Sequence, residues 1–143
     1  MNKTLIAASL ALGLGALAML GLRPGGEEGP PPVSIGMACV NPVAGCATRI
    51  GDHAVSFGAQ GRPEPLKPFQ LWVKAPGAKS VVASFTMPDM NMGLNVYTLR
   101  ADGDGVFTAR VILPICISGR GDWLITVEID HALRLAAPFA LAR

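Results

Sequence analysis

The sequence predicts an all-β domain, an antiparallel sandwich of about seven strands, preceded by an N-terminal hydrophobic helix. Three observations predict this class: short segments of alternating apolar and polar residues, turn residues between them, and no sustained helical periodicity beyond the leader. Glycine and proline supply 17 and 12 of the 143 residues, which favours a turn-rich β domain over a helical bundle. A chain of this length suits one modest domain.

Residues 1–22 are the first element and are predicted to be an export leader. Lys3 and the amino terminus carry positive charge, and residues 5–22 then continue for 18 residues without a charge. The pattern is typical of a signal peptide with a long apolar region, and it just reaches the length of a membrane-spanning helix, about 20 residues. A signal peptide and an uncleaved N-terminal membrane anchor are both open, and the anchor is favoured. Either one places the domain outside the cytoplasm.

Residues 23–35 are predicted to be a linker, because they are rich in proline and glycine. Such a segment cannot pack a core, and we expect an extended tether between the leader and the domain. The β-sandwich domain is predicted to occupy residues 36–143.

A pair of cysteines opens the domain. Six residues separate Cys39 from Cys46, and Asn41, Pro42 and Gly45 favour a turn between them. The leading interpretation is a local disulfide bond, which an exported chain permits. The spacing is longer than the two-residue gap of zinc knuckles and thioredoxin-type motifs. The alternative is that one or both cysteines approach a methionine-rich segment further along the chain and bind metal.

Seven candidate strands follow the cysteine pair. Alternation is clear in the segment 122–130, where Trp123, Ile125 and Val127 point to one face. Turn residues separate the strands, and the segment 101–105 is typical of a hairpin turn. The predicted strands are 53–57, 69–73, 79–86, 94–99, 106–113, 122–130 and 133–139.

Three of the six methionines lie close together, at Met87, Met90 and Met92, among proline, aspartate, asparagine and glycine. Those neighbours make turns and poor cores, so these methionines are unusual as packing residues. Thioether sulfur is a soft donor that suits Cu(I), and in an extended segment Met90 and Met92 project to the same face. The segment therefore predicts a soft-metal site. The alternative is that the methionines cap the core or form a contact surface.

Cys116 lies in a second loop, between the last two strong predicted strands. Pro114 ends the incoming strand, and a polar turn of Ser-Gly-Arg-Gly-Asp follows the cysteine. Three interpretations stay open for Cys116. It is a buried cysteine that acts as a small hydrophobe, it forms a disulfide with Cys39 or Cys46, or its thiolate joins the methionines at a copper site.

Charge and residue types argue against several function classes. The formal net charge of +2 is small and scattered, so no nucleic-acid partner is expected. His53 and His131 are interpreted as surface or edge residues. Because no Ser-His-Asp arrangement, paired carboxylates or phosphate-binding glycine loop stands out in the sequence, the chain is predicted not to be an enzyme.

Three segments carry a resemblance to known families. They are Phe-Thr-Met-Pro-Asp-Met-Asn-Met-Gly at 85–93, Gly-Val-Phe-Thr-Ala at 105–109 and Gly-Asp-Trp-Leu-Ile-Thr-Val at 121–127. Together they resemble the YtkA-like and FixH-like families, which are membrane-tethered bacterial envelope domains. The chain is also similar to uncharacterised proteobacterial periplasmic proteins that combine Met-Asn-Met-Gly with Leu-Pro-x-Cys.

The resemblance implies a small immunoglobulin-like sandwich and a role near copper handling or respiratory oxidase assembly. It points to Met87, Met90 and Met92 as site residues, whereas Cys116 has no counterpart in the FixH-like pattern. It also implies a bacterial inner-membrane protein with a periplasmic domain, or a soluble periplasmic protein if the leader is cleaved.

The leading hypothesis is a periplasmic, membrane-tethered copper-binding or copper-transfer accessory protein. Met87, Met90 and Met92 are the expected donors for Cu(I), with Cys116 as a candidate fourth. The expected partners are the membrane, through the N-terminal helix, and an envelope or respiratory-complex protein. Two alternatives stay open: a non-metal envelope interaction domain that uses the Met-Asn-Met-Gly loop as its contact surface, and a thiol-redox accessory protein that uses the three cysteines.

Overall fold

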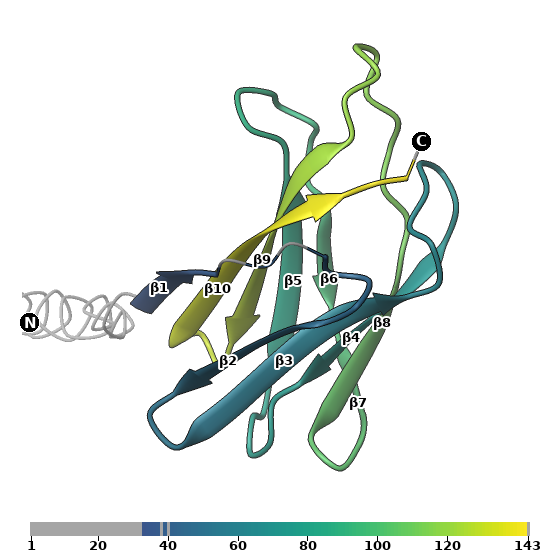
Figure 1. The fold of residues 1–143 in the computed structure, drawn as a ribbon. Helices are drawn as coiled ribbons and strands as arrows, with labels where there is room; N and C mark the ends of the chain where they lie inside the picture. The colour runs from purple at the N-terminus through teal and green to yellow at the C-terminus, as the bar shows by residue number, and fades with distance from the viewer. Residues whose placement is uncertain (1–32, 38, 40, 143) are drawn as a thin grey trace, which may run out of the picture. The chain divides into compact units, whose positions relative to one another are not determined.

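The computed structural model describes residues 33–37, 39 and 41–142, and its regular structure is all β, with no helix in that part of the chain. The strands are β1 Val33–Gly36, β2 Cys46–Ile50, β3 His53–Gln60, β4 Phe69–Lys74, β5 Val81–Thr86, β6 Val96–Thr98, β7 Arg100–Gly103, β8 Val106–Val111, β9 Asp122–Ile129 and β10 Leu133–Ala140. They form two five-stranded sheets, with the orders β1-β10-β9-β5-β6 and β2-β3-β4-β8-β7 (Figure 1).

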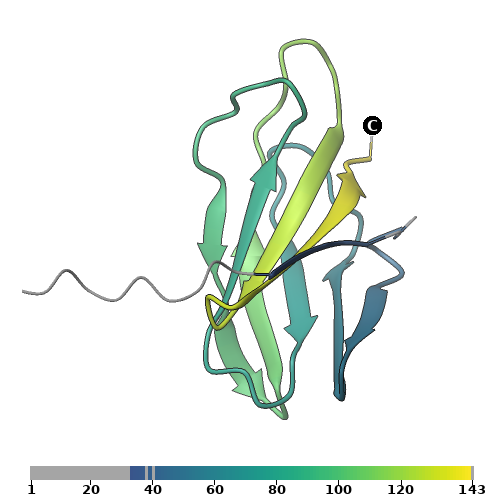
Figure 2. The same ribbon diagram turned by 90° about the vertical axis from the view of Figure 1, so that its left-hand side faces the viewer.

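The alternation of apolar and polar residues decides which face of each strand is buried. In β9 the side chains of Trp123, Ile125 and Val127 are buried, and the residues between them are partly exposed. β5 and β10 follow the same pattern, and so does β4 in the other sheet. The two sheets therefore turn their apolar faces toward each other and share one core between the layers (Figure 2).

Three phenylalanines join the two sheets in the core. The ring of Phe69, from β4, stacks on Phe139 of β10 with centroids 5.6 Å apart. Phe85 of β5 meets Phe139 edge to face at 5.2 Å. Offset and edge-to-face arrangements are the favoured ones for aromatic pairs, so this cluster is a rigid contact between the layers. Because Phe85 lies two residues before Met87, the cluster supports the start of the methionine segment.

The all-β prediction is confirmed, but the described residues contain ten strands instead of about seven. β1 and β2 precede the first predicted strand, and β1 lies across the predicted boundary between linker and domain. β1 also pairs with β10 in parallel, with Val33 beside Leu133, whereas an antiparallel arrangement was expected. The predicted strand 94–99 ends early, because buried Leu99 marks the point where the chain leaves β6 and enters β7 in the other sheet.

A disulfide bond joins Cys39 and Cys46, whose Cα atoms are 5.6 Å apart, and this confirms the leading interpretation of that pair. The loop that the bond closes packs against Trp72 over Gly58. A Cβ atom at Gly58 would lie 2.7 Å from the indole ring and 2.9 Å from the carbonyl oxygen of Pro42, so this close approach requires glycine. Because the two cysteines bond to each other, neither is available to Cys116.

The predicted leader, residues 1–22, and most of the predicted linker lie outside the described residues. Within the part that is described, no helix is long and apolar enough to cross a membrane.

Candidate functional site

Two loops lie side by side at one end of the sandwich: residues 87–95 after β5 and residues 112–121 after β8 (Figures 1 and 2). The hydroxyl of Tyr97 connects their bases. It donates a hydrogen bond to the carbonyl oxygen of Ile112 and accepts one from the Ile112 amide at 3.3 Å. Since Tyr97 belongs to β6 and Ile112 follows β8, this contact bridges the two sheets where the loops begin.

A tight turn at Met87–Met90 shapes the first loop. Pro88 fixes the second position of the turn, and Asp89 adopts a left-handed φ of 59° at the third. The Met90 amide donates to the Met87 carbonyl oxygen at 3.3 Å and closes the turn. Aspartate tolerates the left-handed conformation better than most residues, so this turn is accessible without glycine. The chain therefore reverses between the first and second methionines.

Side-chain amides hold the rest of this loop. The Asn91 side chain accepts a hydrogen bond from the Gly93 amide at 2.9 Å. Asn95 donates from Nδ2 to the Met92 carbonyl oxygen at 3.0 Å. Both are local side-chain contacts that compete with strand pairing, and they explain why residues 91–95 form a loop instead of extending β6.

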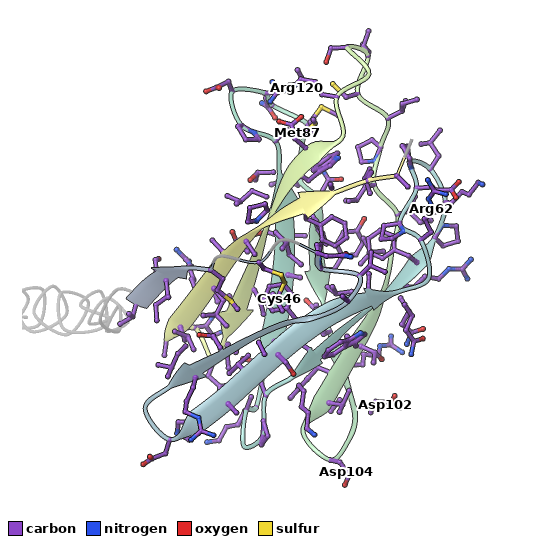
Figure 3. All side chains as sticks on the ribbon, viewed as in Figure 1. Cys46, Arg62, Met87, Asp102, Asp104 and Arg120 are labelled. Atoms are coloured by element: carbon purple, nitrogen blue, oxygen red, sulfur yellow. A yellow bond between two sulfur atoms is a disulfide. The ribbon has the colours of Figure 1, made fainter. Side chains whose placement is uncertain are left out.

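The three predicted methionine donors have different environments. Met87 is only 3% exposed and belongs to the hydrophobic core. Met90 and Met92 are half-buried and pack against the edge of that core. Figure 3 labels Met87 near Arg120, at the loop end of the sandwich. The turn therefore separates Met87, which points inward, from the two methionines that follow it.

Met90 and Cys116 bring two sulfur atoms together across the loops. The distance between Cys116 Sγ and Met90 Sδ is 3.2 Å, although the residues are 26 positions apart in the sequence. The thiol of Cys116 also lies 3.0 Å from the Ser118 hydroxyl oxygen. The Gly119 amide donates to the Cys116 carbonyl oxygen at 2.9 Å and holds the second loop in a turn around the thiol. The hydroxyl, the thiol and the thioether thus form one continuous chain of contacts.

The surroundings of Cys116 favour its ionised form. The hydrogen bond with the Ser118 side chain lowers the pKa of the Cys116 thiol below its ordinary value of 9.0. Burial raises the pKa but has the smaller effect, and the nearby guanidinium of Arg120 adds a further lowering. Arg120 itself donates to Asp122 from Nε at 2.9 Å, and it lies at the same end of the molecule as Met87 in Figure 3. Cys116 is therefore a more acidic thiol than an ordinary cysteine, and the thiolate is the form in which a cysteine binds metal or acts as a nucleophile.

The sulfur pair nearly matches the geometry of a metal site. With a metal–thiolate bond of about 2.3 Å, two sulfurs of a tetrahedral site lie roughly 3.8 Å apart. The observed contact of 3.2 Å between Met90 and Cys116 would open by about 0.6 Å to admit an ion. A methionine side chain has three rotatable bonds, which favours such an adjustment.

Histidine and carboxylate side chains of the described residues do not form a further group of metal ligands beside the Met90–Cys116 sulfur pair. Among the described residues, no group of three or more histidine, cysteine, aspartate or glutamate side chains is arranged to hold a metal ion. His131 Nδ1 lies 2.8 Å from a Glu128 carboxylate oxygen in an exposed pair. His53 lines a cavity of about 220 Å³ between the turns that precede β3, β5 and β10, away from the sulfur atoms. Any metal at the loops would depend on methionine sulfur in addition to Cys116.

Sequence reasoning missed one participant, Ser118, which it treated as a turn residue only. The available signal is the Cys-x-Ser spacing, because serine two residues from a polar group often forms a local hydrogen bond. The structure brings the sulfur atoms of Met90 and Cys116 into contact, and it buries Met87 in the core.

The comparisons with known proteins add no family to this description. No protein family, no curated protein and no solved structure matches the chain.

Proposed function

We propose that this chain is a Cu(I)-binding accessory protein whose site is built on Met90 and Cys116. The observation that carries the proposal is the 3.2 Å contact between their sulfur atoms. A thioether and a thiolate are both soft donors, and such donors favour Cu(I) over Mg²⁺ and Ca²⁺. Half-buried Met92 is proposed as the third donor, because it lies two residues from Met90 on the same loop and its side chain is flexible.

Charge supports the same assignment. The Ser118 hydrogen bond lowers the pKa of Cys116, so the thiol gives up its proton more readily when an ion arrives. One thiolate and two neutral thioethers then carry a single negative charge, which a monovalent Cu(I) ion neutralises. A divalent ion would leave a positive charge on a site whose Arg120 guanidinium is already close to Cys116.

The cellular setting belongs to this proposal as well. The Cys39–Cys46 disulfide favours an oxidising compartment, as does the leader-like pattern of residues 1–22. We place the domain in the bacterial periplasm, tethered to the inner membrane, with an immunoglobulin-like fold. Respiratory oxidase assembly is the process that the resemblance to YtkA-like and FixH-like domains implies.

The test is an anaerobic titration of the full-length chain with Cu(I) in competition with a colorimetric chelator. Met90→Leu and Cys116→Ser are each expected to lower the affinity at least about tenfold, because each removes a soft donor. Met87→Leu is the matched control, since it removes a thioether from the same turn but from the core side. Unchanged affinity in the Met90→Leu/Cys116→Ser double variant would refute the proposal.

A second candidate function has its own observation. Leu94 and Ile117, one on each loop, are 95% and 105% exposed, and large exposed apolar side chains are frequent at interaction surfaces. A domain that binds a protein there without metal would show no Cu(I) affinity in the titration, and its partner binding would not change in Met90→Leu. A thiol-redox function has less support, because Cys116 is the free cysteine and the other two are bonded together.

A further inference from the structure

A hollow of about 520 Å³ lies on the side of the sandwich where β6 of one sheet approaches β8 of the other. Its volume is within the range of small-molecule sites, roughly 300–1,000 Å³. None of the residues that line it is an aspartate or a glutamate. Most of its lining side chains are polar, and they belong to Gln70, Tyr97, Thr98, Arg100, Thr108 and Arg110. We call this feature the arginine hollow.

The register of β7 and β8 brings the two arginines of the hollow together. Arg100 lies opposite Thr108 across the two strands, and Arg110 is two residues further along β8. Alternate residues of a strand point to the same face of the sheet, and diagonal neighbours of this kind lie about 7–8 Å apart. The two guanidinium groups therefore flank the Thr108 position on one face. Gln70 lies beside Arg110 on the neighbouring strand β4.

Neither arginine is neutralised by a carboxylate in the part of the chain that the structure describes. No side-chain hydrogen bond or ion pair there includes Arg100 or Arg110, whereas Arg120 and Arg134 are each held by a carboxylate. Both side chains of the hollow are exposed, and like charges at neighbouring positions of a sheet disfavour each other. An anion bound between the two guanidinium groups would remove this repulsion.

The rest of the same sheet adds to the positive potential around the hollow. Its five strands carry Arg49, Lys74, Arg100 and Arg110 but a single carboxylate, that of Asp102. The excess is local, because the formal net charge of the whole chain is only +2. A surface with an excess of one sign attracts ligands of the opposite sign.

We propose that the arginine hollow binds the phosphate group of a phosphate monoester. A guanidinium group presents its N–H donors in a planar fork that matches phosphate oxygens, and hydrogen bonds between charged groups are the strong ones. A phosphate monoester carries a charge of about −1.5 to −2 at pH 7, which the two arginines balance. The Thr108 hydroxyl and the Gln70 amide supply neutral donors, and the volume of the hollow leaves room for the organic part of the ester.

The phosphate site goes beyond the proposed Cu(I) function and is independent of it. The hollow takes its lining from strands β4, β6, β7 and β8, and neither Met90 nor Cys116 belongs to that lining. Loss of one activity in a variant therefore leaves the other to be measured in the same protein.

The test is isothermal titration calorimetry of the full-length chain with glycerol 3-phosphate, in uncharged detergent micelles. A phosphate-free buffer of about pH 7.5 and about 0.15 M ionic strength keeps the ester doubly charged and suppresses weak surface attraction. Arg100→Gln and Arg110→Gln are each expected to weaken binding at least about tenfold, because each removes a charge-assisted contact. Arg49→Gln is the matched control. It removes the same charge from the same sheet outside the hollow, and it should change the affinity by less than about twofold.

Three outcomes of this titration would overturn the assignment. They are no binding of the ester, unchanged affinity in both variants of the hollow, and an equal loss in Arg49→Gln, which would show attraction by the general charge alone. Arg110→Lys adds a test of geometry, because lysine keeps the charge and loses the planar fork. We expect its affinity to lie between those of the unmodified chain and Arg110→Gln, and affinity as low as that of Arg110→Gln would contradict a contribution from charge.

Two further titrations identify the class of ligand and its source. Acetate carries one charge and is expected to bind at least about tenfold more weakly than glycerol 3-phosphate, so equal affinity would overturn the preference for phosphate. Phosphatidate added to the micelles presents the same phosphate monoester on a lipid. Competition by phosphatidate in the unmodified chain, lost in Arg100→Gln, supports a lipid headgroup as the source. Binding of glycerol 3-phosphate that phosphatidate leaves unchanged supports a soluble ester.

Discussion

Substitutions of Met87 test whether this residue packs in the core or binds the metal ion. Met87 is 3% exposed and sits in the core cluster, so Met87→Ala removes every atom beyond Cβ from a packed site. Buried methionine-to-alanine changes cost about 2–5 kcal/mol, and the position of Met87 at the loop end of the core permits some relaxation, which favours about 2–3 kcal/mol. For a domain of this size, that loss lowers Tm by roughly 8–12 °C.

The assay combines thermal unfolding, followed by circular dichroism, with the anaerobic Cu(I) titration. Met87→Leu keeps most of the volume and should cost less than about 1.5 kcal/mol. Both variants should keep the Cu(I) affinity of the unmodified chain at temperatures where they are folded. The reasoning fails if Met87→Ala leaves Tm unchanged. It also fails if Met87→Leu weakens Cu(I) binding as much as Met90→Leu does, because Met87 would then be a ligand.

Three further predictions follow from single contacts. Gly58→Ala should lower Tm by several degrees, because its Cβ would lie 2.7 Å from a tryptophan ring atom and 2.9 Å from a carbonyl oxygen; an unchanged Tm would contradict this packing. The Ser80 amide donates to Asp130 at 2.7 Å and lowers the pKa of that carboxyl below its ordinary 3.8. The Asp130 contribution to stability is therefore present above pH 3.8 and is lost as the pH falls through the lowered pKa, and Asp130→Asn should flatten the acid limb of Tm against pH. Ser118→Ala should raise the pKa of the Cys116 thiol, and the pH profile of iodoacetamide alkylation should move to higher pH; a profile that stays in place would remove the role of the hydroxyl.

Most of the strands that sequence patterns predicted have one buried and one exposed face. β9 is the clearest case, since apolar residues at every second position leave one way to bury them. β1 was not predicted, because its four residues follow a proline-rich segment and are too few to show an alternation of apolar and polar residues. Its parallel partner β10 is distant in sequence, and such pairing leaves no local signal.

Only part of the site could be predicted from the sequence, because contacts between residues that are distant in sequence leave no local signal. The sequence placed Cys116 near the methionines as one of three interpretations, and soft donor chemistry pointed to the segment that contains Met90. It could not show which methionine meets the thiol, because that depends on the left-handed φ of Asp89. Aspartate permits this conformation but does not require it, so the direction of each methionine side chain became known only from the three-dimensional structure.

The hydroxyl of Tyr97, which joins the bases of the two loops, gives the molecule an intrinsic optical probe. Tyr97 is the single tyrosine in the sequence. Its oxygen contacts both the carbonyl oxygen and the amide of Ile112, so any shift of one loop against the other changes the hydrogen bonding of the phenol. Ultraviolet difference spectra of the unlabelled protein would therefore report loop movement during ligand uptake, without an added dye.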